Sequence, residues 1–428
     1  MVRGENDCCF DSHSANYPNI LNIGSTLSDK WTYACSFKGM NTKELFLEIL
    51  YFNSKIRTID WEFGYWGGTL KRWYDEGLPK TFGLSKEVTY GEGVCGPGLH
   101  WPMLSFANEI ALEKDVHNYF NFDENLTTFP FNHWIYPKFE KKIIKKVNNK
   151  IELWDSDGIK KVIFKDGSSM PFWLEFPVKN EKDWEILKEE RLNLNTLGNR
   201  YMDSMEDFLN KAKSRSFPLC LFGDPVGFFG SLRFLIGEEN LFLFYYDKPM
   251  LIKNIQNYLC DFWIQIAEEI LAKADIDCVF FWEDMSGKNG SLISPKIFRE
   301  FMTPCYKRII NFLRNKGLKH FVVDTDGNVS ELIPLFLEVG ITGMYPFEVQ
   351  AKNDILKIRK KYPHLQIFGG IDKNELAKDK LAIDNELVKV KEMIKLGGYI
   401  PYADHLIPPN VSWENFKYYR NKLKEIIF

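Results

Sequence analysis

The segment that decides the fold reads His320-Phe321-Val322-Val323-Asp324-Thr325-Asp326-Gly327-Asn328-Val329. It begins as a short apolar, β-branched run, reaches two carboxylates one residue apart, and ends in a Gly-Asn turn before a helix-like segment, 330–339. This order is typical of a buried parallel strand followed by its crossover helix. Asp324 and Asp326 are therefore predicted at the carboxyl end of a strand, where parallel α/β folds bind their ligands.

Similar strand-then-helix units recur along the chain. Counting this one, the strand candidates are 58–66, 171–178, 217–223, 277–282, 319–323, 343–347, 366–369 and 398–401. Eight such units predict an α/β fold of the (β/α)₈ TIM-barrel type. The alternative is an open doubly wound sheet, which normally carries a glycine-rich phosphate loop directly after its first strand. GxxxxGK[ST] does not occur in the sequence, and the GxGxxG at 91–96 lies in the irregular stretch and not directly after a strand candidate.

The domain organisation follows from changes in pattern. Residues 1–39 have no sustained periodicity and no signal-peptide features, so we expect a disordered tail or a segment foreign to the native domain. An amphipathic helix after Met40 begins a single domain, 40–428, with a helical and irregular start. An insertion, about 79–170, is predicted to hold an irregular lid or docking region, 79–137, and a small antiparallel meander of 139–147, 151–154 and 159–164.

Composition narrows the class of protein. The 428 residues are 45% hydrophobic with a formal net charge of -3, which gives no basic footprint for nucleic acid. No run is long and apolar enough to span a membrane, and the eight cysteines lack metal-ligand or disulfide spacing. We therefore expect a cytoplasmic protein with free thiols and a small-molecule substrate.

The predicted strand ends are strongly acidic. They carry Glu62, Glu175, Asp224, Glu283, Asp284, Asp324, Asp326, Glu348, Asp372 and Asp404, the last followed by His405. Carboxylates that converge in a low-dielectric site repel one another, so they must pair with basic groups, cap helices, become protonated or hold a cation. Asp372 is better explained as a helix cap, and Asp224 suits a turn as well as a site.

Several motifs together resemble the uroporphyrinogen decarboxylase superfamily, and more closely its uncharacterised bacterial branch near the corrinoid-linked methyltransferases. The motifs are 281–290 with Ile293-Ser294-Pro295, then 323–328, Gly369-Gly370-Ile371-Asp372-Lys373, and 397–411. The resemblance implies a TIM barrel with its active site at the carboxyl face. It covers roughly 40–428 and is densest after Phe217.

The resemblance also implies a metal site. In methylcobamide:coenzyme M methyltransferases of the superfamily, a His-x-Cys and a later Cys hold zinc, and the matching positions are Asp324, Asp326 and His405. These oxygen and imidazole ligands would suit a divalent metal, possibly zinc. Alternatively, the two aspartates bond to backbone amides and His405 is a neutral residue.

These expectations combine into one hypothesis and two alternatives. The hypothesis is metal-assisted methyl transfer between a small methylated or methoxylated substrate and a corrinoid protein, with Glu283 as general acid or base and Glu62 and Glu348 orienting the substrate. Aromatic residues are expected to wall the pocket: Trp61, Tyr65, Trp66, Phe228, Trp282, Tyr345 and Tyr402. The first alternative is porphyrinogen decarboxylation, although 61–68 lacks the Arg-Gln-Ala-Gly-Arg-Tyr pattern of true decarboxylases and acidic strand ends would repel a polycarboxylate. The second is a non-catalytic barrel that binds a cationic or polyhydroxylated ligand.

Overall fold

The structure is a computed structural model that describes residues 39–83, 104–106, 114–164, 171–202 and 205–428. The chain divides into two units, Met1–Gly39 and Met40–Phe428, and every described helix and strand belongs to the second. The tail predicted for 1–39 lies outside the described residues apart from Gly39.

A parallel sheet of eight strands forms the centre of this unit. Its strand order is β1-β2-β7-β8-β11-β12-β13-β14, and every neighbouring pair is parallel. The strands are β1 (Leu104–Phe106), β2 (Leu126–Thr128), β7 (Leu219–Phe222), β8 (Cys278–Trp282), β11 (Phe321–Asp324), β12 (Gly343–Tyr345), β13 (Gln366–Phe368) and β14 (Tyr399–Ile400). The six strands predicted from Phe217 onward are thereby confirmed. The fold is α/β, with a curled parallel sheet consistent with a TIM-like barrel.

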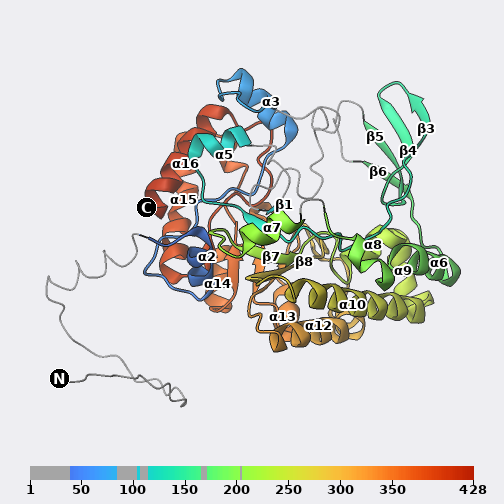
Figure 1. The fold of residues 1–428 in the computed structure, drawn as a ribbon. Helices are drawn as coiled ribbons and strands as arrows, with labels where there is room; N and C mark the ends of the chain where they lie inside the picture. The colour runs from blue at the N-terminus through green and yellow to red at the C-terminus, as the bar shows by residue number, and fades with distance from the viewer. Residues whose placement is uncertain (1–38, 84–103, 107–113, 165–170, 203–204) are drawn as a thin grey trace, which may run out of the picture. The chain divides into compact units, whose positions relative to one another are not determined.

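Helices accompany the sheet along the whole chain (Figure 1). Longer ones are α2 (Thr42–Leu50), α3 (Gly67–Asp75), α6 (Glu181–Arg191), α8 (Gly230–Ile236), α9 (Glu238–Asp247), α10 (Pro249–Leu271), α12 (Thr303–Asn315), α13 (Leu332–Val339), α15 (Lys380–Leu396) and α16 (Trp413–Ile427). Sequence signals explain their ends: Asn41 and Glu44 form a capping box at α2, and Gly340 ends α13 at a φ of 100°. None of the described helices is long and apolar enough to cross a membrane.

The alternation of side chains along the strands separates two hydrophobic cores. Leu221 and Val279 belong to the larger core, which also takes in the surrounding helices, while Cys220 and Phe280 belong to a smaller one. The smaller core gathers residues from most strands of the sheet and from the apolar face of α2. Because this cluster joins β14, at one end of the sheet, to β2, next to the other end, the sheet curls around it.

The strand predicted at 58–66 is wrong as an assignment. Only Tyr65 forms a ladder contact, a parallel bridge to Ile407 after β14. The segment still runs beside the sheet, because the Thr58 hydroxyl donates to the carbonyl of Tyr399 at 2.7 Å. On its other side, the amide of Asp123 donates to the carbonyl of Asp60 at 3.3 Å. The segment therefore lies between β14 and the residues that lead into β2.

The strand predicted at 171–178 is also assigned to the wrong sheet. It forms β6 (Phe172–Glu175), which pairs antiparallel with β5 (Lys160–Phe164) in a sheet of order β3-β4-β5-β6. Here β3 (Lys142–Val147) and β4 (Lys150–Trp154) confirm the predicted meander and its Asn148-Asn149 turn. Figure 1 shows this small sheet beside α6, α8 and α9. Because β1 and β2 join the main sheet, 79–170 is not purely an insertion.

Candidate active site

The carboxyl ends of β7, β8, β11 and β14 bring one group of ionisable side chains together. Asp324 is the last residue of β11, and its carbonyl accepts the amide of Glu283 at the end of β8 at 2.9 Å. The pKa of Asp324 is raised by Asp326, Asp284 and Asp224, which places these four carboxyls within electrostatic reach of one another. They form the acidic group at the centre of the candidate site.

Asp326 and His405 form an ion pair in this group. The Nε2 atom of His405 lies 3.4 Å from Oδ2 of Asp326, and both side chains keep partial exposure, 24% and 33%. Burial acts to lower the pKa of His405, but the charge and hydrogen bond of Asp326 outweigh it and raise that pKa. Burial likewise opposes ionisation of Asp326, yet His405 lowers its pKa. The pair is therefore an imidazolium beside a carboxylate.

Asp324 is in the opposite state. Its side chain is buried and hydrogen-bonded to Tyr345, the register partner on β12. Burial and the neighbouring carboxylates, Asp326 first, raise its pKa well above the usual range. Desolvation and like charge both favour the neutral acid.

Asp224 and Asp284 complete the acidic group. Burial, with the charge of Asp284, raises the pKa of Asp224 to about 7. Its Oδ1 atom is shielded from solvent and has no hydrogen-bond partner among the described residues. Asp284 instead pairs with Arg233 of α8, whose Nη1 lies 2.6 Å from Oδ2. Burial is also the main cause of the raised pKa of Asp284, with Asp326 adding to it.

A second network lies on the side of β12 and β14. Lys373 places its Nζ 3.2 Å from Oε1 of Glu348 and 3.4 Å from Oδ1 of Asp404. Glu348 also accepts the amide of Gly327, in the turn after Asp326, at 3.0 Å. Burial raises the pKa of Asp404 to about 6, although Lys373 acts to lower it. Glu348 thus ties Lys373 to the loop that carries the Asp326–His405 pair.

Two carboxylates expected to act in catalysis are fully engaged with the scaffold. Glu283 is buried, and its oxygens accept the amides of Phe228, Phe229 and Gly230 at 2.7, 2.6 and 2.8 Å, together with the hydroxyl of Tyr306. These amides lie at the start of α8, where a carboxylate stabilises unpaired N–H groups.

Glu62 is equally enclosed. It accepts the amides of Phe63 and Ala403 at 3.0 and 2.9 Å and pairs with Arg420 of α16 at 3.0 Å. Arg420 also binds Asp60, so one guanidinium holds two buried carboxylates. The structure places Glu62 in a structural network, while Glu348 lies at the partly exposed mouth.

The expected aromatic lining divides in the same way. Tyr345 and Tyr402 lie at the acidic group, since the charge of Asp324 raises the pKa of both hydroxyls after the larger effect of burial. Trp61, Tyr65 and Phe228 are buried in the hydrophobic cores. Trp66 only packs against the smaller core, and Trp282 stacks on Phe234 at 5.1 Å.

The metal expected from Asp324, Asp326 and His405 does not fit this arrangement. No three or more His, Cys, Asp or Glu side chains of the described residues are grouped so that they could hold a metal ion. The carboxyl of Asp324 is instead hydrogen-bonded to Tyr345, and Nε2 of His405 is engaged with Asp326. The arrangement is one of proton-sharing pairs, which corrects the expectation of a three-ligand site.

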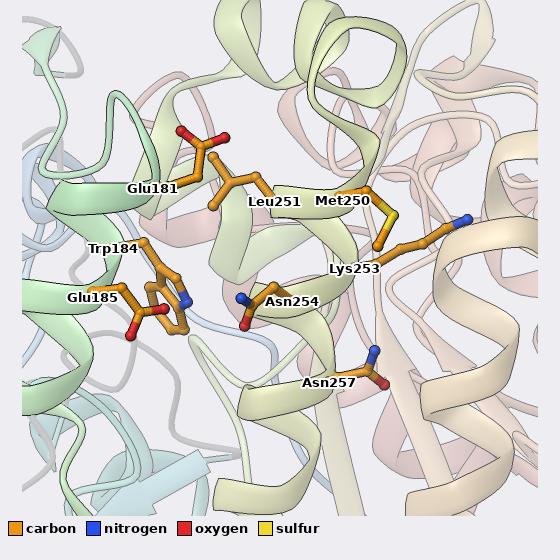
Figure 2. A pocket seen from close by; sticks show the side chains of 8 residues that line it. All are labelled: Glu181, Trp184, Glu185, Met250, Leu251, Lys253, Asn254 and Asn257. Carbon is orange, nitrogen blue, oxygen red and sulfur yellow. The ribbon is translucent and has the colours of Figure 1, made fainter.

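Two surface hollows lie away from the acidic group. Figure 2 shows one of about 320 Å³ between α6 and α10, lined by Glu181, Trp184, Glu185, Met250, Leu251, Lys253, Asn254 and Asn257. Another, of about 540 Å³, lies between α6 and the small antiparallel sheet. Neither contains any member of the acidic group, so the chemistry of the side chains, not cavity size, identifies the candidate site.

Sequence reasoning missed the partners that set the state of this site. No signal in the sequence distinguishes Arg233 and Lys373 from the other basic residues of the chain, and Asp224 was equally well explained as a turn. The sequence offered one signal, which is that Asp284 directly follows Glu283. Because successive side chains at the end of a strand point in opposite directions, the two acids are expected to have different partners.

Comparison with known proteins adds a family. Residues 161–426 match the family model described as Uroporphyrinogen decarboxylase (URO-D). Solved structures with some likeness include xylanase B from Clostridium stercorarium F9, at 14% identity and a TM-score of 0.30, covering 55% of this chain and 85% of that chain. Another is a B12-independent methionine synthase from Shewanella sp. W3-18-1, at 13% identity and a TM-score of 0.28, covering 51% and 66%. These two likenesses are too slight to carry an argument, and no curated protein matches.

Proposed function

The chain belongs to the uroporphyrinogen decarboxylase (URO-D) family, and from that premise we propose that it is a barrel enzyme that transfers a methyl group from a small methylated or methoxylated substrate to a corrinoid protein. In this proposal it falls in the methyltransferase-like branch of the family. We infer that the curled sheet closes into a barrel where 58–65 runs between β14 and the residues before β2.

One observation carries the proposed chemistry. Asp324 is a buried carboxyl at the carboxyl end of β11, bonded to Tyr345 and kept protonated by burial and by three acidic neighbours. Removing a methyl group from oxygen or nitrogen leaves the electron pair on that atom, which must end with a proton or as a neutral group. A carboxylic acid poised in a partly desolvated site supplies that proton.

The remaining side chains of the site position this acid. The Asp326–His405 pair and the Arg233–Asp284 pair fix charge on two sides of Asp324, while Glu348 and Lys373 orient the substrate at the mouth. Glu283 and Glu62 hold the loops and are positioning residues. The corrinoid, carried by the partner protein, supplies the acceptor for the methyl carbon.

The test is methyl transfer to a purified small corrinoid protein. The full chain is incubated with that protein, in its reduced state, and a panel of methoxylated and N-methylated compounds, and methylation is followed by the visible spectrum of the corrinoid. We expect Asp324→Asn, which keeps the shape but cannot donate a proton in the same way, to lower the rate by about 10²–10⁴-fold. Asp275→Asn, an exposed residue before the amino end of β8, is the matched control.

Decarboxylation is the second candidate, because the matching family model is named for that activity. This reaction also needs a proton donor, since it ends when the carbon atom that lost carbon dioxide is protonated. Against it, the basic side chains of the described site, Arg233, His405 and Lys373, already pair with carboxylates, so they are not free to bind the carboxylates of a porphyrinogen. Incubation with uroporphyrinogen decides the matter: release of carbon dioxide would replace methyl transfer as the function. A folded protein that binds small ligands and turns over neither class would instead be a binding barrel.

A further inference from the structure

The balance of charge at the acidic group points to the kind of substrate. Arg233 pairs with Asp284, and His405 pairs with Asp326. Asp224 and Asp324, by contrast, have no basic partner within the described part of the chain. In the free protein these two carboxyls meet the deficit of positive charge by holding protons. A ligand that brings its own positive charge would remove the need for those protons.

Two buried polar atoms without partners mark where such a ligand binds. Oδ1 of Asp224 is shielded from solvent and accepts no hydrogen bond from any described residue. The hydroxyl of Tyr402, in a side chain with no exposure, also has no partner in the described structure, although it interacts electrostatically with Asp324. Buried polar groups are rarely left unpaired. Oδ1 of Asp224 therefore lacks a hydrogen-bond donor, and the hydroxyl of Tyr402 lacks a hydrogen-bond partner, among the described residues.

The floor of the site strengthens any charge interaction above it. Phe63 packs against Tyr345, Tyr402 and His405, with ring centroids 6.3, 5.9 and 5.3 Å apart. Three of these four rings are buried, so the carboxyls stand over apolar surface and not over water. Attraction between opposite charges is several times stronger in such surroundings than in bulk solvent.

From these observations we propose that the substrate is a protonated N-methylated amine, whose N–H donates to Asp224 and whose positive charge replaces the missing basic partner of Asp224 and Asp324. This inference rests on the proposed methyl transfer and names its methyl donor. For this donor the carbon–nitrogen bond breaks, the electron pair stays on nitrogen, and a neutral amine that keeps its own N–H leaves as the methyl group passes to the acceptor. Asp324 then acts as a charge partner of the ammonium group, and its role as proton donor applies to a methoxylated donor, whose oxygen arrives without a proton.

A divalent metal ion is a poorer match for the same deficit. Metal ions need several ligand atoms at bonding distance around one point. The described carboxyls are instead held apart by Tyr345, Arg233 and His405. An ammonium group carries one charge, directs its N–H at a single acceptor, and covers its remaining faces with methyl groups that suit an apolar floor.

The test is calorimetric binding of three probes of similar shape to the full-length protein: trimethylammonium, tetramethylammonium and tert-butanol. Trimethylammonium has both charge and an N–H, tetramethylammonium has charge alone, and tert-butanol is neutral. We expect trimethylammonium to bind at least tenfold more tightly than tert-butanol and more tightly than tetramethylammonium. Asp224→Asn should weaken trimethylammonium at least fivefold and leave tert-butanol unchanged, while Asp275→Asn should change neither.

The contrary outcomes are equally definite. Equal affinity for tert-butanol, or unchanged affinity in Asp224→Asn, would overturn the inference, as would a divalent metal ion that binds at this site when trimethylammonium does not. Equal affinity for tetramethylammonium would overturn the N–H contact. Binding as expected with no methylation of a corrinoid protein would sink the proposed function alone. Methyl transfer from a neutral methoxylated compound, without ammonium binding, would sink this inference alone.

Discussion

Replacement of Glu283 by glutamine tests whether this residue holds the scaffold or performs chemistry. Oε1 accepts the amide of Phe228 and the hydroxyl of Tyr306, and Oε2 accepts the amides of Phe229 and Gly230. Glutamine has one acceptor oxygen and one donating amino group. If the NH₂ group takes the place of Oε2, the amides of Phe229 and Gly230 lose their acceptor. If it takes the place of Oε1, the amide of Phe228 loses its acceptor, while the hydroxyl of Tyr306 must turn from donor to acceptor.

The magnitude follows from that count. A buried donor left without an acceptor costs about 1–3 kcal/mol, and the better orientation of the amide leaves one such donor, the amide of Phe228. Burial raises the pKa of Glu283, which means that the folded protein already bears a penalty for its charge. Removal of the charge returns part of this penalty. We therefore expect Glu283→Gln to lower the free energy of unfolding by about 1–3 kcal/mol.

The assay is urea unfolding followed by far-UV circular dichroism, with the midpoint shifted and the slope unchanged. Glu300→Gln is the control, because Glu300 makes an exposed pair with Lys253 and its loss should cost less than about 1 kcal/mol. Tyr306→Phe removes one of the displaced donors, so in the double variant the two losses should fail to add by at least about 0.5 kcal/mol. A Glu283→Gln protein as stable as the control variant would refute the structural role and return Glu283 to the list of candidate acids.

Three further predictions concern charge. As the pH rises from about 4 to about 7, Asp224→Asn should become more stable relative to wild type by up to about 1.4 kcal/mol per pH unit. The reason is that the raised pKa of Asp224 makes the folded wild type hold a proton that its unfolded chain has lost. Urea unfolding across this pH range measures the slope, and a stability difference that does not change with pH would contradict the prediction. Asp326→Asn should lower the pKa of His405, which NMR titration of labelled histidine follows, and an unchanged pKa would exclude the ion pair as its cause. Arg420→Met should cost about 3–5 kcal/mol in the free energy of unfolding, because two buried carboxylates lose their cation, and a loss below about 1 kcal/mol would show that they are protonated instead.

The later part of the sheet could be predicted because its strands follow one rule. From β7 to β14 each strand of the parallel sheet is a short apolar run that ends at a turn and leads to a helix, as 320–329 shows. The first strands do not follow it. The segment 58–66 is dense in aromatic residues and pairs mainly through side chains, and β2 is three residues long within an irregular stretch.

The misplacement of β6 has a different cause. Its pattern, Phe172-Trp173-Leu174-Glu175, is apolar in the way a buried parallel strand is apolar, yet its first three side chains are exposed at an edge of the antiparallel sheet. Local composition does not state which partner a strand will find. The number of strands was therefore predicted correctly, while two of the eight were assigned to the wrong segments.

In the candidate site, too, the positions of residues along the chain could be predicted, but their partners from distant segments could not. The sequence placed Glu283, Asp284, Asp324 and Asp326 together at the strand ends, but it could not separate scaffold from reactive group. That separation depends on distant partners: Glu283 meets three amides that follow β7, whereas Asp324 meets only Tyr345 and other acids. Carboxyl groups at one edge of one sheet thus meet different surroundings, which are N–H donors at Glu283 and other acids at Asp324.

The carboxyl groups at the strand ends divide into those with N–H donors and those without. A carboxylate whose oxygens are filled by N–H donors is fixed in charge and place, so it can shape a site without exchanging a proton. Asp224 and Asp324 have neither a set of N–H donors nor a basic partner among the described residues. Holding them in a buried, acidic site costs the fold stability, and the expected gain in Asp224→Asn would measure this cost at Asp224. If that variant is more stable at neutral pH and no longer binds trimethylammonium, the same like-charge repulsion both strains the free protein and recognises the cation that relieves it.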